Sequence, residues 1–125
     1  IATQLSIVLT ESPSSKNITV KELVSLGRHP YTNWIGMLTE VDEKIIEESL
    51  IDTDTVNLVN KKCSELSDGQ LQRVMIARAL VQDTPIILLD EPTTHLDIYH
   101  RAYILKLLKD LANKKKKTIL CTFLN

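Results

Sequence analysis

Two adjacent acids, Asp90 and Glu91, directly follow an apolar run and are the residues of this chain best placed to act on a bound ligand. The run, residues 86–89, is too short for a helix and suits a strand buried on both faces of a parallel sheet. Open α/β sheets bind ligands at the carboxyl ends of their strands, which is where both acids would lie. The first candidate site is therefore this strand end.

A second candidate precedes that strand, where Ser67, Gly69 and Gln70 could build an anion site from free backbone amides. Ser67 can accept a hydrogen bond from an amide of the helix it opens, and Gln70 can reach back to the amide of Ser67, which is a capping box. Gly69 keeps the turn free of a side chain, so a ligand could approach the backbone closely. The helix dipole adds roughly 0.3–1 kcal/mol for an anion at an exposed site.

One helix must connect the two candidates. The pattern predicts it from Leu71 to about Gln82, with Pro85 ending it before the apolar run begins. Read without regard to function, the same stretch is a capped core helix followed by a core strand whose acids merely turn the chain. The first interpretation gives residues 66–97 a role in ligand binding, and the second gives them a structural role only.

Four motifs follow one another in this stretch: LSDGQ, QRVMIARAL, IILLDEP and, at residues 94–97, THLD. Their order and spacing closely resemble the ATP-binding subunit of ABC transporters, where they are the signature loop, signature helix, Walker B strand and D-loop. LSxGQ alone is a short and weak motif, but four such motifs in series over about thirty residues are a strong signal.

The resemblance implies ATP hydrolysis with Mg²⁺. Phosphoryl transfer requires charge neutralisation and a positioned attacking water. By resemblance, Asp90 binds Mg²⁺ through a water, and Glu91 polarises the attacking water.

The resemblance also implies a head-to-tail dimer of two ATPase subunits. Ser67 and Gly69 would touch the γ-phosphate of ATP held by the other subunit, with Asp68 and Gln70 nearby. The family more often has glycine where Asp68 stands, and an acid there is unfavourable unless it points away, as a cap turn allows. Asp97 would link the two sites across the dimer.

Glu11 occupies the place at which the family has the glutamine of its Q-loop. A carboxylate there can still bind Mg²⁺ through oxygen, but it adds negative charge beside Asp90 and Glu91. A solvated loop acid remains an equal alternative for Glu11.

The sequence contains no G-x-x-x-x-G-K-[ST] phosphate-binding loop, and none of its three glycines is followed by lysine. The histidine that the family carries just after its last core strand is also absent, because Thr122 or Phe123 stands there. We therefore expect the chain to be an internal fragment of an ATPase subunit, inactive alone.

Composition fits one small globular domain with ordinary apolar content, 43%, and charged content, 25%. The formal net charge of -1 gives no overall attraction to nucleic acid. No apolar run is long enough to span a bilayer. Cys63 and Cys121 read as reduced, buried thiols of a cytosolic protein.

The remaining pattern predicts strands at about residues 4–9 and 118–122 and a loop at 32–38. Residues 54–59 are predicted to form a short helix or a turn. Thr19 with Glu22 predicts another capping box, at the start of a helix that ends near Gly27. Thr39 is predicted to cap a helix over residues 40–51.

That second helix predicts an apolar stripe that includes Val41 and a solvated acidic face that includes Asp42. Arg28 and His29 are interpreted as a loop pair. Asp97 is expected to cap a last helix, with apolar positions at residues 98, 102, 104, 105, 108, 111 and 112. The lysines at 114–117 are interpreted as plain solvation.

The same resemblance implies an α/β fold class: a partial P-loop NTPase core of three parallel strands with an inserted helical subdomain. Residues 1–11 and 83–125 would form the core and residues 12–82 the helical subdomain with the signature. In the family the P-loop strand pairs with the last of these strands, so the strand at 118–122 would lack that partner here, and such an edge favours self-association.

Residues 26–31, LGRHPY, resemble importer ATPases for iron–siderophore, haem and cobalamin. That resemblance implies membrane permease subunits as partners, a periplasmic binding protein indirectly, no nucleic acid, and a cytoplasmic place at the inner face of the membrane. It does not name the transported molecule.

Two other functions stay open at this point. Chromosome-maintenance and double-strand-break ATPases carry a similar signature and Walker B pair, but they place coiled coils before the signature and no sustained heptads occur here. A non-hydrolytic nucleotide-sensing or interaction module is the second alternative, against which the retained Asp90–Glu91 pair argues.

Overall fold

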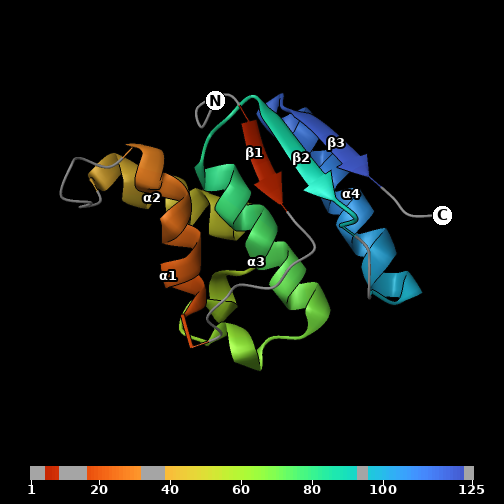
Figure 1. Ribbon diagram of the computed structural model, residues 1–125, viewed down its shortest axis with the longest axis horizontal. Helices are drawn as coiled ribbons and strands as arrows, with labels where there is room; N and C mark the ends of the chain where they lie inside the picture. The colour runs from red at the N-terminus through yellow and green to blue at the C-terminus, as the bar shows by residue number, and fades with distance from the viewer. Residues whose placement is uncertain (1–4, 9–16, 32–38, 93–95, 123–125) are drawn as a thin grey trace.

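The computed structural model describes residues 5–8, 17–31, 39–92 and 96–122. It contains a three-stranded sheet with β2 (Ile86–Asp90) between β1 (Leu5–Val8) and β3 (Thr118–Thr122). Both pairings are parallel, so each connection crosses over through helices. Figure 1 shows the helical elements that link β1 to β2 on one side and α4 (Ile98–Lys115) behind the sheet. The predicted three-stranded parallel α/β fold is confirmed.

The two faces of this sheet differ in burial, which corrects the prediction of a strand buried on both faces. Ile87 and Leu89 are almost fully buried against α3 (Asp68–Val81) and α4. The register aligns Leu88 with Ile7 and Leu120 on the opposite face. Ile7 and Leu120 are each 53% exposed, so that face is largely open among the residues described.

The helical part begins with α1 (Val20–Ser25), which continues into a 3-10 helix, η1 (Leu26–Tyr31). It then contains α2 (Glu40–Asp52) and the short 3-10 helices η2 (Val56–Leu58) and η3 (Cys63–Glu65). The capping boxes expected at Thr19 and Thr39 are both present. These helices pack on α3 (Asp68–Val81) around a second apolar core.

Helix α3 contributes to both cores. Ile76, Ala79 and Leu80 face the sheet, whereas Val74 and Ala77 face α1 and α2. A helix buried on two sides needs no single apolar stripe, because each face meets a different partner. The helix therefore ties the helical part to the sheet.

The α-helix ends at Ser25 with Leu26 as its C-cap, so the predicted helix end near Gly27 is confirmed, and the chain continues into η1. A Cβ atom at Gly27 would lie 2.2 Å from Cγ2 of Val81 and 2.4 Å from the carbonyl oxygen of Arg78. The missing side chain therefore lets the backbone of η1 pack directly on the end of α3.

The sequence misplaced several surface residues. In α2, Val41 is 65% exposed although the stripe included it. In α4, the buried positions are Ile104, Leu108 and Leu111, while Ile98 is 76% and Leu105 is 44% exposed. A helix lying on a sheet buries a narrower stripe than its apolar content suggests. The predicted loop at 32–38 and the ends of the first and last predicted segments lie outside the described residues.

The lysine run is not plain solvation. Lys114 Nζ lies 2.7 Å from Asp52 Oδ1, and Lys115 Nζ lies 3.0 Å from Asp52 Oδ2 and also bonds Glu48. Lys117 pairs with Asp83 at 3.2 Å. The carboxylate of Asp52 is only 2% exposed. Lys114 and Lys115 thus join the end of α4 to the end of α2, and Lys117 contacts the segment after α3.

We expect acid to weaken this junction. Burial alone would raise the pKa of Asp52, but hydrogen bonds from Lys114 and Lys115 bring it below its usual value. An aspartate with a lowered folded-state pKa stabilises the fold above its unfolded pKa of about 3.9, and that stability is lost as the pH falls through the folded value. Melting temperatures across about pH 3 to 7 should therefore fall less steeply on the acid side in Asp52→Asn than in the parent.

Asp110→Asn is the control for this measurement, because Asp110 is an exposed acid of α4. Its acid limb should match that of the parent. If Asp52→Asn and the parent lose stability in parallel as the pH falls, the ion cluster contributes nothing to the junction.

We also expect residues 1–125 to self-associate as a purified chain. Among the described strands, β3 has a partner on one edge only, and Leu120 on its open face is 53% exposed. Unpaired apolar edges template association. Light scattering behind size exclusion should show larger species as concentration rises, and fewer of them for Leu120→Lys. A strictly monomeric chain at high concentration would contradict this expectation.

No helix among the described residues is long and apolar enough to cross a membrane.

Candidate functional site

The backbone at Glu91 is in a strained conformation directly after β2. Its φ is 51°, in the left-handed region, and its side chain is half-buried ahead of the buried Pro92. A non-glycine residue in this region costs roughly 1–2 kcal/mol, and such strain persists mainly at functional sites. The backbone therefore bends at Glu91, directly after β2.

Asp90 is the last residue of β2 and alternates with Leu89, so it belongs to the open face of the sheet. It is half-buried and is aligned with Thr122 of β3. Both acids thus lie at the carboxyl edge of the sheet, as the sequence predicted.

The capping box predicted at the start of α3 is present. Gln70 N donates to Ser67 Oγ at 3.2 Å, and Ser67 N donates to Gln70 Oε1 at 3.0 Å. The helix begins at Asp68, three residues earlier than predicted, because Ser67 is itself the N-cap. Asp68 is exposed in the first turn, where a negative charge is favourable.

Gly69 lies inside that first turn and is buried, because an imidazole covers it. A Cβ atom there would lie 2.7 Å from Cδ2 of His100. The glycine therefore makes room for the side chain of His100 from α4. Sequence reasoning missed His100, although it stands one helical turn after Asp97 and so faces the same way.

Asp97 caps α4, as predicted. Its Oδ1 accepts hydrogen bonds from the backbone N and from Nδ1 of His100, both at 2.9 Å. The bond from the His100 amide, with that from the His100 ring, holds the pKa of Asp97 below its usual value. The carboxylate stays ionised and 61% exposed.

The starts of α3 and α4 lie side by side. His100 bonds Asp97 and packs on Gly69, so the two capped helix ends are in contact. Figure 1 shows that both helices begin at the end of the molecule toward which the strands point. The candidate residues of the strand edge and of the helix ends therefore share one end of the fold. Glu11, Thr94 and His95 lie outside the described residues.

Arg28 and Asp42 form a buried ion pair that corrects two predictions. Arg28 is 5% and Asp42 is 2% exposed, although the first was expected in a loop and the second on a solvated face. Arg28 Nε donates to Asp42 Oδ1 at 2.8 Å, and its Nη1 donates to the carbonyl of Val81 at 2.7 Å. The hydrogen bond from the backbone amide of Thr39 is the largest effect that holds the pKa of Asp42 below its usual value. Burial alone would raise that pKa. The pair ties η1 and α2 to the last turn of α3, just before β2.

The strand edge suits Mg²⁺ only together with further oxygen ligands. No cluster of three His, Cys, Asp or Glu side chains that could hold a metal occurs among the described residues. Mg²⁺ typically takes one or two carboxylates and completes its shell with waters and substrate phosphates. Asp90 fits that donor set.

Comparison with known proteins returned a family and close relatives. The family profile described as ABC transporter matches residues 1–94. A probable siderophore transport system ATP-binding protein of Bacillus subtilis is 43% identical over 120 residues, covering 95% of this chain and 43% of its own length. The chain spans less than half the length of the curated relatives it matches.

Two solved structures share the fold. An inward-facing putative metal-chelate type ABC transporter aligns with a TM-score of 0.88 and 29% identity over 95% of this chain and 48% of that chain. A bacterial ABC transporter cassette solved as a dimer aligns with a TM-score of 0.79 and 33% identity over 98% of this chain and 53% of that chain.

Proposed function

Because the chain belongs to the ABC transporter family, we propose that the protein from which it comes is the ATP-hydrolysing subunit of an importer for an iron–siderophore or related metal chelate. The observation that supports the chemistry best is the strained Glu91 after Asp90 at the carboxyl end of β2. The substrate class rests on the siderophore system and the metal-chelate transporter to which the chain is similar.

In this proposal Glu91 polarises the attacking water, and its left-handed backbone fixes the direction from which the carboxylate acts. Asp90 holds Mg²⁺ through a water. The ion, when bound, neutralises charge on the phosphates. Glu11, at the family's glutamine position, would either add an oxygen ligand for Mg²⁺ or be a solvated loop acid without a role in the reaction.

Ser67, Asp68, Gly69 and Gln70 form the part of the site that serves a second ATPase subunit. The amides at the start of α3 and its dipole favour a phosphate, and Asp68 can stay on the solvent side of the first turn. Asp97 would contact the partner between the two sites. The similarity to a bacterial cassette solved as a dimer supports a dimer of two such subunits.

We further propose that the subunit sits at the cytoplasmic face of the membrane on permease subunits, which receive substrate from a periplasmic binding protein. The core would comprise residues 1–11 and 83–125, and residues 12–82 the helical subdomain.

The test is reconstitution. The whole protein with its permease in vesicles should hydrolyse ATP in the presence of Mg²⁺ and take up a ferric siderophore. Hydrolysis without uptake of any metal chelate tried would contradict the proposed substrate class. Absence of hydrolysis would contradict the proposed ATPase activity.

The chain of residues 1–125 alone should not hydrolyse ATP, because no Gly-x-x-x-x-Gly-Lys loop is present in its sequence to hold the α- and β-phosphates. Phosphate release by the purified chain should equal that of its Glu91→Gln variant at every ATP concentration. Turnover above that background would contradict the assignment.

A further inference from the structure

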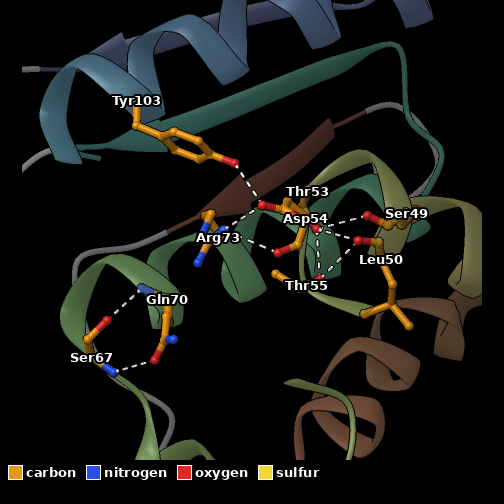
Figure 2. A network of polar contacts seen from close by, with 9 residues as sticks. All are labelled: Ser49, Leu50, Thr53, Asp54, Thr55, Ser67, Gln70, Arg73 and Tyr103. Atoms are coloured by element: carbon orange, nitrogen blue, oxygen red, sulfur yellow. Dashed lines mark hydrogen bonds and ion pairs between the residues drawn. The ribbon is translucent and has the colours of Figure 1, made fainter. Parts of the chain in front are cut away.

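The helices that carry Ser67 and Asp97 are joined by three polar residues to which the proposed function gives no role: Asp54, Arg73 and Tyr103. We name these three the linking cluster. Figure 2 shows them converging from the turn after α2, from α3 and from α4. They come from positions far apart in the sequence, so only the fold brings them together.

Asp54 is the centre of the linking cluster. Arg73 Nη1 donates to the carbonyl oxygen of Asp54 at 3.1 Å and lies 3.4 Å from its Oδ2. The hydroxyl of Tyr103 donates to the same Oδ2 at 3.3 Å. The guanidinium of Arg73 also lies over the Tyr103 ring, 5.3 Å from its centroid. Each member thus contacts both of the others.

The turn that presents Asp54 is itself fixed. Thr53 and Thr55 are fully buried, and their hydroxyls lie 2.9 Å apart. Thr53 Oγ1 also donates to the carbonyl of Ser49 at 2.9 Å, and Asp54 has a φ of 56°. Aspartate tolerates this left-handed conformation better than most residues. A buried pair of threonines therefore holds Asp54 outward in one orientation.

The linking cluster is a second point of contact between the two capped helices. Near their starts, His100 packs on Gly69. Within the next turn of each helix, Arg73 and Tyr103 meet. Two helices in contact at two successive levels cannot easily slide or rotate past each other, so the positions of Ser67 and Asp97 depend on each other.

We propose that Asp54, Arg73 and Tyr103 are positioning residues that hold Ser67 and Asp97 in register, so that both meet the second subunit in the same movement. This inference rests on the proposed function. Asp54 is 75% exposed on its side chain, so its ion pair adds little to stability. Its contribution is to geometry.

The experiment compares matched substitutions in the whole protein. Tyr103→Phe keeps the ring over Arg73 and removes the hydroxyl, and Asp54→Asn keeps a residue that tolerates the left-handed turn. Tyr99→Phe is the control for the first, because Tyr99 lies on the same helix and is 83% exposed. Asp83→Asn is the control for the second, because Asp83 also has a left-handed φ, 52°, and its side chain, which pairs with Lys117, is 63% exposed.

We expect kcat of both test variants to fall about 5- to 50-fold, within the roughly 10²-fold that a 1 Å misplacement can cost, with KM for ATP unchanged. Melting temperatures should stay within about 3 °C of the parent. Hydrogen exchange should rise in the first two turns of both α3 and α4. The controls should match the parent in every readout.

Two results would overturn the inference: unchanged exchange in the first turns of α3 and α4, or raised exchange with unchanged kcat. A fall in kcat matched by a large fall in melting temperature would also overturn it, since the role would then be structural. If the parent itself hydrolyses no ATP, the proposed function fails, and the exchange data alone decide whether the cluster holds the two helices.

Discussion

Glu91→Gln in the whole protein should bind ATP as the parent does and turn it over about 10²–10⁴-fold more slowly, the usual effect of losing a general base. The amide keeps the size of the side chain and its place after β2, but it cannot draw a proton from water. Steady-state phosphate release and nucleotide affinity measure the two effects separately.

The control for Glu91→Gln is Glu47→Gln on α2, which makes the same chemical change at an exposed acid. Its turnover should equal that of the parent. Turnover of Glu91→Gln within a few-fold of the parent would remove Glu91 from the mechanism. Loss of ATP binding together with turnover would point instead to a structural role for the acid.

Arg28→Met should destabilise the fold strongly. It leaves Asp42, only 2% exposed, without its cation, and breaking one partner of a buried pair costs roughly 3–5 kcal/mol. It also removes the donor to the carbonyl of Val81, which joins η1 to the end of α3. The whole protein should melt roughly ten degrees lower, by thermal unfolding.

A double-mutant cycle identifies the cause of that loss. Arg28→Met combined with Asp42→Asn should be less destabilised than the sum of the two single variants, because no buried charge is left unpaired. Lys44→Met, at an exposed position of α2, should melt within a degree or two of the parent. Strict additivity of Arg28→Met and Asp42→Asn would show that the two side chains act independently.

The sequence predicts the local structure of this chain well because its signals are local. Thr19, Thr39, Ser67 and Asp97 each stand immediately before a helical pattern, and each is an N-cap in the structure. Capping depends on residues three positions apart, which a sequence displays directly. The prediction that all three strands run parallel came from the family resemblance rather than from any local pattern.

What the sequence concealed depends on contacts between distant segments. Asp42 appears in a run of charges, and only the approach of Arg28 makes its burial possible. Gly69 seemed to open the backbone to a ligand, whereas the ring of His100 occupies the space. Lys114 and Lys115 were predicted to be solvated, but in the fold they pair with acids at the end of α2. The linking cluster likewise joins three segments that no helical or strand period relates.

The candidate site is divided in the same way. The edge carrying Asp90 and Glu91 could be read from an apolar run followed by two acids, since strands end where ligands bind. The backbone strain at Glu91 could not be predicted from the sequence. Glycine or asparagine can signal a left-handed φ, but glutamate does not. His100 could have been found from its spacing to Asp97, had the contact with Gly69 been foreseen.

The most direct test of the central claim, that this chain supplies the signature and Walker B parts of a head-to-tail ATPase dimer, is complementation between two inactive variants of the whole protein. Ser67→Arg spoils the surface offered to the partner's nucleotide, and Glu91→Gln stops hydrolysis in the subunit's own site. In a head-to-tail dimer of one of each, one composite site keeps both an intact Ser67 and an intact Glu91. Mixing the two purified variants should therefore restore ATP hydrolysis that neither shows alone. Two variants that stay inactive at every mixing ratio, while mixed dimers demonstrably form, would show that Ser67 and Glu91 do not serve one site across two subunits.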